Sequence, residues 1–156
     1  MHDLQPFLAE HDFFKDLDQK YFPLLVGCAK NVRFEPDQVI HREGEPANEF
    51  YLIRTGKVRV AIHSTGIGPV VIQTLRDGDI FGSNWLIPPY KWLFDYTAVE
   101  RTRALSLDGK CLRGKCDEDH DLGYALMMRF SQVLSKRLYM TRMQLLLELE
   151  SFEDDE

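Results

Sequence analysis

The sequence predicts a mainly β fold with flanking helices: an antiparallel β-barrel or jelly roll between N-terminal helices and a long C-terminal helix. Apolar residues recur at helical spacing at both ends, and the middle consists of short alternating segments separated by glycine-containing turns. The 156 residues have the length of one domain, expected to cover 1–150. Its predicted parts are helices at 1–30, a β-barrel at 31–108 and C-terminal helices at 109–150, followed by an acidic tail at 151–156.

The first thirty residues have the spacing of two helices, with apolar series at 4–8 and 17–28. Pro23 lies inside the second series, and proline is tolerated only in the first turn of a helix. We therefore expect this second helix to begin near Asp18.

Within the predicted barrel, residues 58–62 alternate apolar side chains with polar or small ones, as in a strand with one buried face. Turn-forming residues follow at 66–69 and 77–79. The other segments with strand character are 32–34, 39–40, 50–53, 70–75, 96–99 and 104–107.

One long helix is predicted from Asp119 to about Glu148. Acidic residues at 117–121 stand at its start, where the helix dipole favours negative charge. Its apolar residues occupy more than one face, so we expect one face to pack on the barrel and another on a second copy of the chain. The alternative is a helix buried wholly within its own domain. The residues predicted for the dimer interface are Leu126, Phe130, Val133, Leu134, Leu138 and Leu145.

Charge is concentrated at the C-terminus. The net charge is -6, yet residues 148–156 contain six of the 25 acidic residues, so residues 1–147 carry 19 charges of each sign. A neutral body argues against a nucleic-acid-binding domain, and the acidic tail is expected to fray because it opposes the helix dipole. The basic residues of the long helix are interpreted as solvated charges or, alternatively, as a weak patch for an acidic partner: Arg129, Lys136, Arg137 and Arg142.

No apolar run approaches a membrane span and the N-terminus lacks the layout of a signal peptide, so we expect a cytoplasmic protein without a membrane segment. Cys28, Cys111 and Cys116 are too few for a disulfide framework and are predicted to be buried or half-buried reduced thiols. His41 and His63 lack the spacing of a metal site, so neither a metal nor a cofactor is expected.

Two blocks of residues resemble the cyclic nucleotide-binding domain family. The first block is Gly44-Glu45, Phe50 to Ile53, Gly56 and Val58, and the second is Leu75, Gly78-Asp79, Ile80, Phe81-Gly82 and Leu86. The order of helices, barrel and long helix agrees as well, so the resemblance covers nearly the whole chain. It implies a stand-alone effector-type domain, without a catalytic part and without the helix-turn-helix that follows the long helix in transcription factors of this fold.

The resemblance also implies a ligand site after the Phe-Gly pair. In the family, a glycine and a short helix face the cyclic phosphate, a Glu directly after the glycine holds the ribose, and an Arg about ten residues later pairs with the phosphate. Ser83 stands at the Glu position here, and Trp92 stands at the Arg position. Binding of cyclic AMP or cyclic GMP in the usual mode is therefore not expected. The candidate ligand-binding residues are Phe81, Gly82, Ser83, Asn84, Trp85 and Trp92.

The aromatic segment around Trp92 leaves two alternatives open. Its rings can line a different pocket, suited to a flat or apolar ligand, or they can fill the vacated one. Ser83 and Asn84 can serve simply as caps of the short helix. The four rings are Trp85, Tyr90, Trp92 and Phe94.

The leading functional hypothesis is a non-catalytic regulatory module, a homodimer that senses another small ligand or binds a protein partner and does not bind nucleic acid. The alternative is a genuine cyclic-nucleotide receptor in which Lys91 or Arg101 supplies the phosphate cation. A cupin-like metalloenzyme on a similar barrel is a third hypothesis, from a different functional class.

Overall fold

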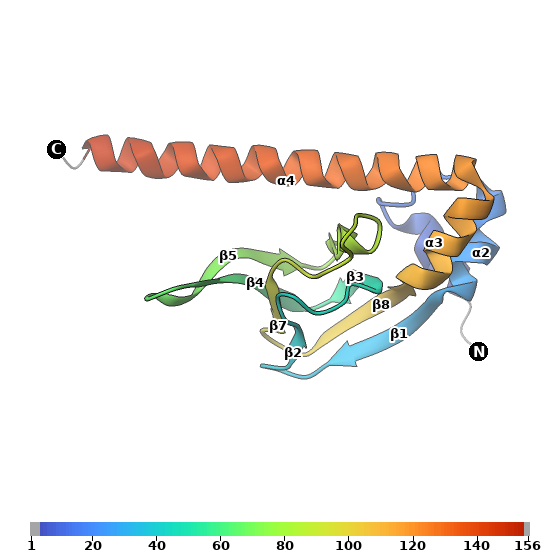
Figure 1. The fold of residues 1–156 in the computed structure, drawn as a ribbon, viewed down its shortest axis with the longest axis horizontal. Helices are drawn as coiled ribbons and strands as arrows, with labels where there is room; N and C mark the ends of the chain where they lie inside the picture. The colour runs from blue at the N-terminus through green and yellow to red at the C-terminus, as the bar shows by residue number, and fades with distance from the viewer. Residues whose placement is uncertain (1–3, 155–156) are drawn as a thin grey trace.

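A computed structural model describes residues 4–154 (Figure 1). Its helices are α1 (Gln5–Glu10), the 3₁₀ helix η1 (Gln19–Tyr21), α2 (Phe22–Gly27), the 3₁₀ helix η2 (Ser83–Trp85), α3 (Gly109–Glu118) and α4 (His120–Asp154). Its strands are β1 (Ala29–Phe34), β2 (Val39–His41), β3 (Glu49–Thr55), β4 (Lys57–Ser64), β5 (Gly68–Arg76), β6 (Ile80–Phe81), β7 (Asp95–Ala98) and β8 (Thr102–Asp108).

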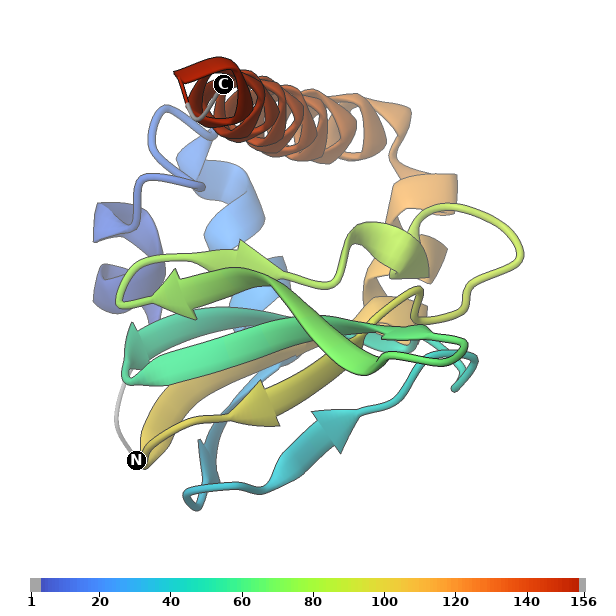
Figure 2. The same ribbon diagram turned by 90° about the vertical axis from the view of Figure 1, so that its left-hand side faces the viewer.

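The strands form two four-stranded antiparallel sheets, in the orders β1–β8–β3–β6 and β2–β7–β4–β5. Figure 2 shows α4 above the sheets, with the N-terminal helices and α3 below it. This confirms the predicted fold class, a mainly β jelly roll with N-terminal helices and a long C-terminal helix. The short strand β6 is an addition to the predicted strands.

Strand β3 lies between two hydrophobic cores, because successive side chains of a strand point to opposite faces of its sheet. Phe50 and Leu52 belong to the core beneath the helices, called here the helix core. Tyr51 and Ile53 belong to the core between the two sheets, the sheet core. The apolar run of β3 is therefore buried on both faces.

The N-terminal helices follow the prediction closely. Pro23 lies in the first turn of α2, where its missing N–H needs no partner. The preceding turn η1 is capped by Asp18, whose side chain accepts a hydrogen bond from the backbone N–H of Lys20 at 3.0 Å. The second helical segment thus starts at Asp18.

Asp119 separates α3 from α4 and caps the long helix. Its backbone is extended, and its Oδ1 accepts hydrogen bonds from the N–H groups of Asp121 (3.1 Å) and Leu122 (3.3 Å). Helix α4 has 35 residues, which corresponds to about 52 Å, and it projects beyond the sheets (Figure 1). It continues to Asp154 instead of ending near Glu148, so residues 151–154 are helical where a frayed tail was expected.

The cysteines correct the prediction of reduced thiols. Cys28 and Cys111 form a disulfide, with their Cα atoms 6.0 Å apart. The antiparallel pairing of β1 with β8, with Ala29 opposite Leu107, brings the end of α2 to the start of α3. The two cysteines are 83 residues apart, so no local pattern shows that they meet. Cys116 is a half-buried free thiol, as predicted, and burial raises its pKa.

Candidate functional site

Gly82 follows β6 and begins η2 in a conformation that favours glycine. Its φ of +100° lies in the left-handed region. A Cβ at this position would lie 2.6 Å from Trp92 Cη2 and 3.0 Å from the carbonyl oxygen of Glu49. The backbone of Gly82 is therefore in direct contact with the Trp92 ring.

Trp92 is fully buried in the sheet core. Its ring stacks on His41 with the centroids 4.3 Å apart and the planes at 13°, and it meets Tyr96 edge-on at 5.0 Å. The indole thus occupies the space beside Gly82, where the resemblance places the cyclic phosphate. Of the two alternatives for this segment, the position of Trp92 favours a filled pocket.

Backbone pairing with the loop before β3 holds Trp92 in place. The N–H of Trp92 donates to the carbonyl oxygen of Glu45 at 2.9 Å, and the N–H of Gly44 donates to the carbonyl oxygen of Trp92 at 2.8 Å. Trp92 Nε1 has no hydrogen-bond partner within residues 4–154. The side chain is therefore positioned by ring packing and by its own backbone.

A hydrogen-bonded chain of three side chains lies beside Trp92. His41 Nε2 is 2.8 Å from the Tyr51 hydroxyl, which donates to Glu49 Oε2 at 2.6 Å. Burial lowers the pKa of His41, and the nearby carboxylate of Glu49 partly opposes this. Burial also raises the pKa of Tyr51. Both groups are therefore neutral near pH 7.

The four aromatic rings predicted around the site do not converge. Trp85 is fully buried in the helix core, where it stacks on Phe50 with the centroids 5.4 Å apart. Tyr90 is exposed, and Phe94 packs half-buried against the sheet core. Trp85 and Trp92 therefore lie in different cores and do not line one pocket.

The polar residues near Gly82 have other roles than those predicted. Ser83 and Asn84 are half-buried in η2, whose N-cap is Gly82 without a side-chain cap, so they are not its caps. Lys91 and Arg101, the alternative phosphate cations, are both exposed. Arg101 lies in the turn before β8, next to the first residue of this strand. Phe81 pairs with Tyr51, and Tyr51 pairs with Ser106 near the other end of β8. Arg101 and Phe81 are therefore at opposite ends of this strand.

The part of the chain that the structure describes contains no cluster of three or more His, Cys, Asp or Glu side chains that could hold a metal ion. The two histidines considered in the sequence have other neighbours. His63 Nε2 lies 2.8 Å from Asp95 Oδ2, and His41 takes part in the chain beside Trp92.

Part of the predicted dimer interface is covered by the chain itself. Leu126 and Phe130 are 0% and 3% exposed and belong to the helix core, so the structure places them inside their own chain and not at a dimer seam. Helical periodicity identifies a buried face but not what covers it. The other predicted residues are the half-buried Val133 and the exposed Leu134 (41%), Leu138 (52%) and Leu145 (55%).

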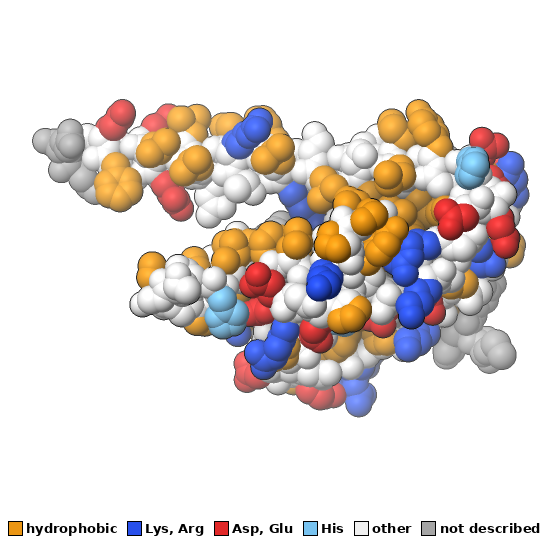
Figure 3. Space-filling view, in the orientation of Figure 1, with side chains coloured by type: hydrophobic (Ala, Val, Ile, Leu, Met, Phe, Trp, Pro, Cys, Tyr) orange, Lys and Arg blue, Asp and Glu red, His pale blue; other side chains and the backbone are white. Residues whose placement is uncertain are grey.

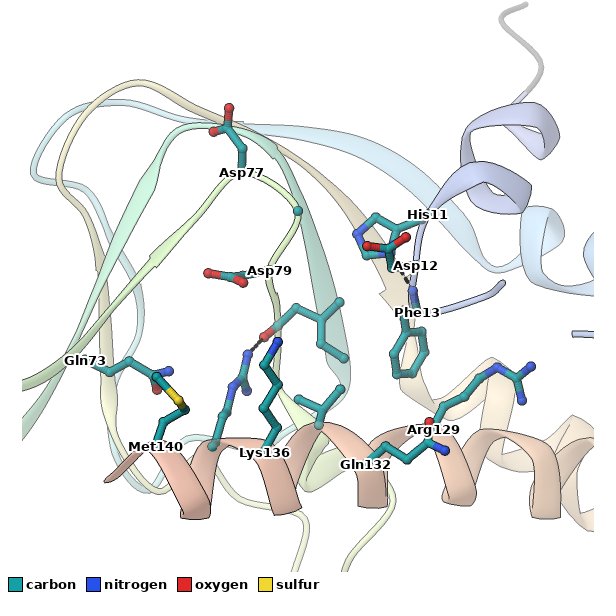
Figure 4. A pocket seen from close by; sticks show the side chains of 14 residues that line it. His11, Asp12, Phe13, Gln73, Asp77, Asp79, Arg129, Gln132, Lys136 and Met140 are labelled. Atoms are coloured by element: carbon teal, nitrogen blue, oxygen red, sulfur yellow. Dashed lines mark hydrogen bonds between the residues drawn. The ribbon is translucent and has the colours of Figure 1, made fainter. Parts of the chain in front are cut away.

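A cavity of about 590 Å³, called here the α4 cavity, lies between α4, the β5–β6 turn and residues 11–13 (Figure 4). Its α4 wall carries basic residues that were interpreted as solvated charges. Arg129 and Arg137 are instead half-buried: Arg129 donates to the carbonyl oxygen of Lys15 at 3.1 Å, and Arg137 donates to that of Ile80. Burial lowers the pKa of Arg137. Basic residues of α4 thus attach this helix to the rest of the domain.

Comparison with known proteins identifies relatives of the whole domain. The family model described as "Cyclic nucleotide-binding domain" matches residues 31–119. A cGMP-dependent protein kinase of Toxoplasma gondii is 27% identical over 136 residues, covering 87% of this chain and 13% of the kinase. A CRP-like cAMP-activated global transcriptional regulator of Mycobacterium tuberculosis is 24% identical over 134 residues, covering 86% of this chain and 58% of the regulator. The chain therefore spans less than two thirds of the length of both relatives.

A solved structure has the same fold. A putative cyclic nucleotide-binding protein from Geobacter metallireducens is similar with a TM-score of 0.79 and 23% identity, over 88% of this chain and 99% of that one. None of the described helices is both long and apolar enough to span a bilayer. Because the family model matches more than half of its residues, the chain belongs to the cyclic nucleotide-binding domain family.

Proposed function

We propose that this chain is a non-catalytic regulatory module that senses a small ligand other than cyclic AMP or cyclic GMP. The family is one of regulatory binding domains. The chain covers only 13% of the kinase and 58% of the transcriptional regulator, and the family model that it matches is that of the binding domain, which supports a regulatory role and not a catalytic one.

The observation that carries the proposal is the Trp92 ring beside Gly82. The ring is fully buried and in contact with the Gly82 backbone, so a phosphate can reach this position only if the indole moves away. Trp92 also stands where the resemblance expects an Arg, and a buried phosphate without a cation suffers a large desolvation penalty.

Isothermal titration calorimetry with cyclic AMP and cyclic GMP tests this proposal. We expect no saturable heat at micromolar nucleotide. A variant combining Ser83→Glu with Trp92→Arg, checked for folding by circular dichroism, restores the two groups of the family and is expected to gain binding. Micromolar binding of either nucleotide by the unmodified chain would overturn the proposal.

We also infer a homodimer through the outer part of α4. Figure 3 shows apolar side chains on both the upper and lower edges of α4, and along the edge of the β4–β5 hairpin that faces this helix. The exposed apolar residues of α4 continue as far as Phe152. A second copy of the same helix offers a matching apolar face, as in a coiled coil.

Sedimentation velocity at tens of micromolar protein tests the dimer. Leu138→Glu and Leu145→Glu are expected to give monomers, because each places a charge on the apolar face. Lys110→Glu, at an exposed residue of α3 and so outside the face of α4, serves as the control and should leave the dimer intact. A monomeric unmodified chain would contradict the inference.

A further inference from the structure

The α4 cavity is separate from the space that Trp92 fills. Neither Gly82 nor Trp92 lines it, and its walls come from α4, strand β5, the β5–β6 turn and residues 11–13. Its volume of about 590 Å³ lies within the usual range of small-molecule sites. The proposed sensing function requires a ligand site, and the filled space beside Gly82 does not provide one.

The α4 wall of the cavity presents hydrogen-bond donors. Lys136 extends from α4 toward the cavity in Figure 4, and it has no hydrogen bond or ion pair with any residue between 4 and 154. Arg137, the next residue, donates one guanidinium N–H to the carbonyl oxygen of Ile80, and its other N–H groups make no hydrogen bond within residues 4–154. Gln132 adds a side-chain amide to the same wall.

The carboxylates around the cavity do not neutralise these cations by contact. Asp77 Oδ1 accepts the N–H of Gly56, between β3 and β4, at 2.7 Å, and Asp79 Oδ2 accepts the N–H of Arg76, within its own turn, at 2.8 Å, so both carboxylates bind backbone groups. In Figure 4 the Asp77 carboxylate points away from α4. Asp12 is exposed at the edge of the cavity. Within the described chain, no salt bridge joins these acids to the basic residues of α4.

Part of the cavity wall is apolar. Phe13 and Ile80 are buried residues of the helix core, and Val133 packs half-buried against the same core. Figure 4 shows the Phe13 ring directed toward α4. The cavity thus combines a cationic side with an apolar side, the pattern of a site for a molecule that has an anionic group on an apolar body.

We propose that the α4 cavity binds a small organic anion. Its phosphate or carboxylate group pairs with Lys136 Nζ and the free N–H groups of Arg137, and its apolar body packs against Phe13, Ile80 and Val133. This inference rests on the proposed function, since it names the ligand class of the sensing module. A bound anion would link α4 to the β5–β6 turn and so stabilise one position of the helix that carries the dimer surface.

A titration of the full chain followed by ¹H–¹⁵N NMR tests the site. The probes are phenyl phosphate, benzoate and the uncharged benzyl alcohol, with inorganic phosphate as the anion lacking a ring. We expect the aromatic anions to shift the amide signals of residues 77–80 and 132–140 with saturation. Benzyl alcohol should bind more weakly by roughly tenfold or more, because it carries no charge and so loses one charge-assisted contact. The ratio of phenyl phosphate to benzoate affinity distinguishes a phosphate ligand from a carboxylate ligand.

Lys136→Gln is the decisive variant, because Lys136 is exposed and its replacement spares the fold. It should weaken binding of the aromatic anions by about tenfold or more, whereas Lys110→Gln, at an exposed lysine of α3 outside the cavity, should bind as the unmodified chain does. The proposal is overturned if neither aromatic anion gives saturable shifts at these residues, or if Lys136→Gln leaves both affinities unchanged. Failure of the proposed function would look different: cyclic AMP would shift the signals of Gly82 and Trp92.

Discussion

The two faces of β6 differ in how tightly they are packed. Phe81 points into the sheet core, where Trp92 and Tyr96 pack around it. Ile80, the preceding residue, points to the other face and lines the α4 cavity. The first face is filled by an indole, while the second borders a cavity whose lining includes Lys136, a lysine without a hydrogen bond or ion pair within residues 4–154. The same short strand therefore borders a closely packed core on one face and a cavity on the other.

Trp92→Ala should give the largest effect, because it removes a fully buried ring from the filled face. We expect a loss of about 3–5 kcal/mol in the free energy of unfolding, measured by urea denaturation. Met140→Ala, at an exposed residue of the α4 cavity, is the control and should change stability by about 0.5 kcal/mol or less. A loss below about 1 kcal/mol for Trp92→Ala would show that the filled face is not tightly packed.

Alanine substitutions at two glycines, one on each face of β6, test the difference in packing directly. At Gly78, which lines the α4 cavity with φ +86°, a Cβ would have no atom within 4 Å beyond its chain neighbours, whereas at Gly82 a Cβ would lie 2.6 Å from Trp92. Gly78→Ala should cost about 1–2 kcal/mol for the left-handed conformation alone. Gly82→Ala should cost roughly 1–3 kcal/mol more, since the buried ring has to shift. Equal losses of stability for the two variants, measured by thermal denaturation, would contradict the proposed difference in packing between the two faces.

Two half-buried histidines, one beside Trp92 and one in the α4 cavity, make the free energy of unfolding depend on pH. Burial lowers the pKa of both His41, beside Trp92, and His11, in the α4 cavity, from the ordinary 6.5. The unfolded chain binds these protons more readily, so the stabilisation is present above about pH 6.5 and is lost as the pH falls toward the folded pKa. Denaturation midpoints at about pH 7.5 and about pH 5.5 should therefore differ less for His41→Gln and His11→Gln than for the unmodified chain. Unchanged pH profiles in both variants would contradict this.

Lys136→Gln should give the smallest change in stability, within about 0.5 kcal/mol, because the side chain is exposed and unpaired within the described residues. Chemical denaturation in the absence of added anions measures it. A loss above about 1 kcal/mol would mean that Lys136 supports the fold, and its effect on anion binding could then not be separated from structure.

Local patterns predicted much of the fold. Alternation located β4, and the rule for proline placed Pro23 in the first turn of α2. Counting from Gly82 placed Trp92 at the position where the family has an Arg, and the structure brings Gly82 and Trp92 into contact. These features depend on neighbours in the chain or on a short motif, which a sequence displays directly.

Features built from distant segments were not predicted. The α4 cavity combines residues near 12, 78 and 136, and no spacing connects them. The apolar stripe of the long helix showed that Leu126 and Phe130 are buried, but only the structure shows that α1, α2 and the strands supply their cover. Arg137 was interpreted as a solvated charge because the carbonyl oxygen it binds, that of Ile80, belongs to a strand 57 residues away.

The Cys28–Cys111 disulfide turns most of the domain into a closed loop of polypeptide. That loop contains all eight strands that the structure describes, while α1, α2 and α4 extend from its two ends. A single protease cut at an exposed turn inside it, such as the one beside Ile67, leaves both halves covalently joined. The nicked domain would therefore keep its sheets together and separate into two fragments only after reduction.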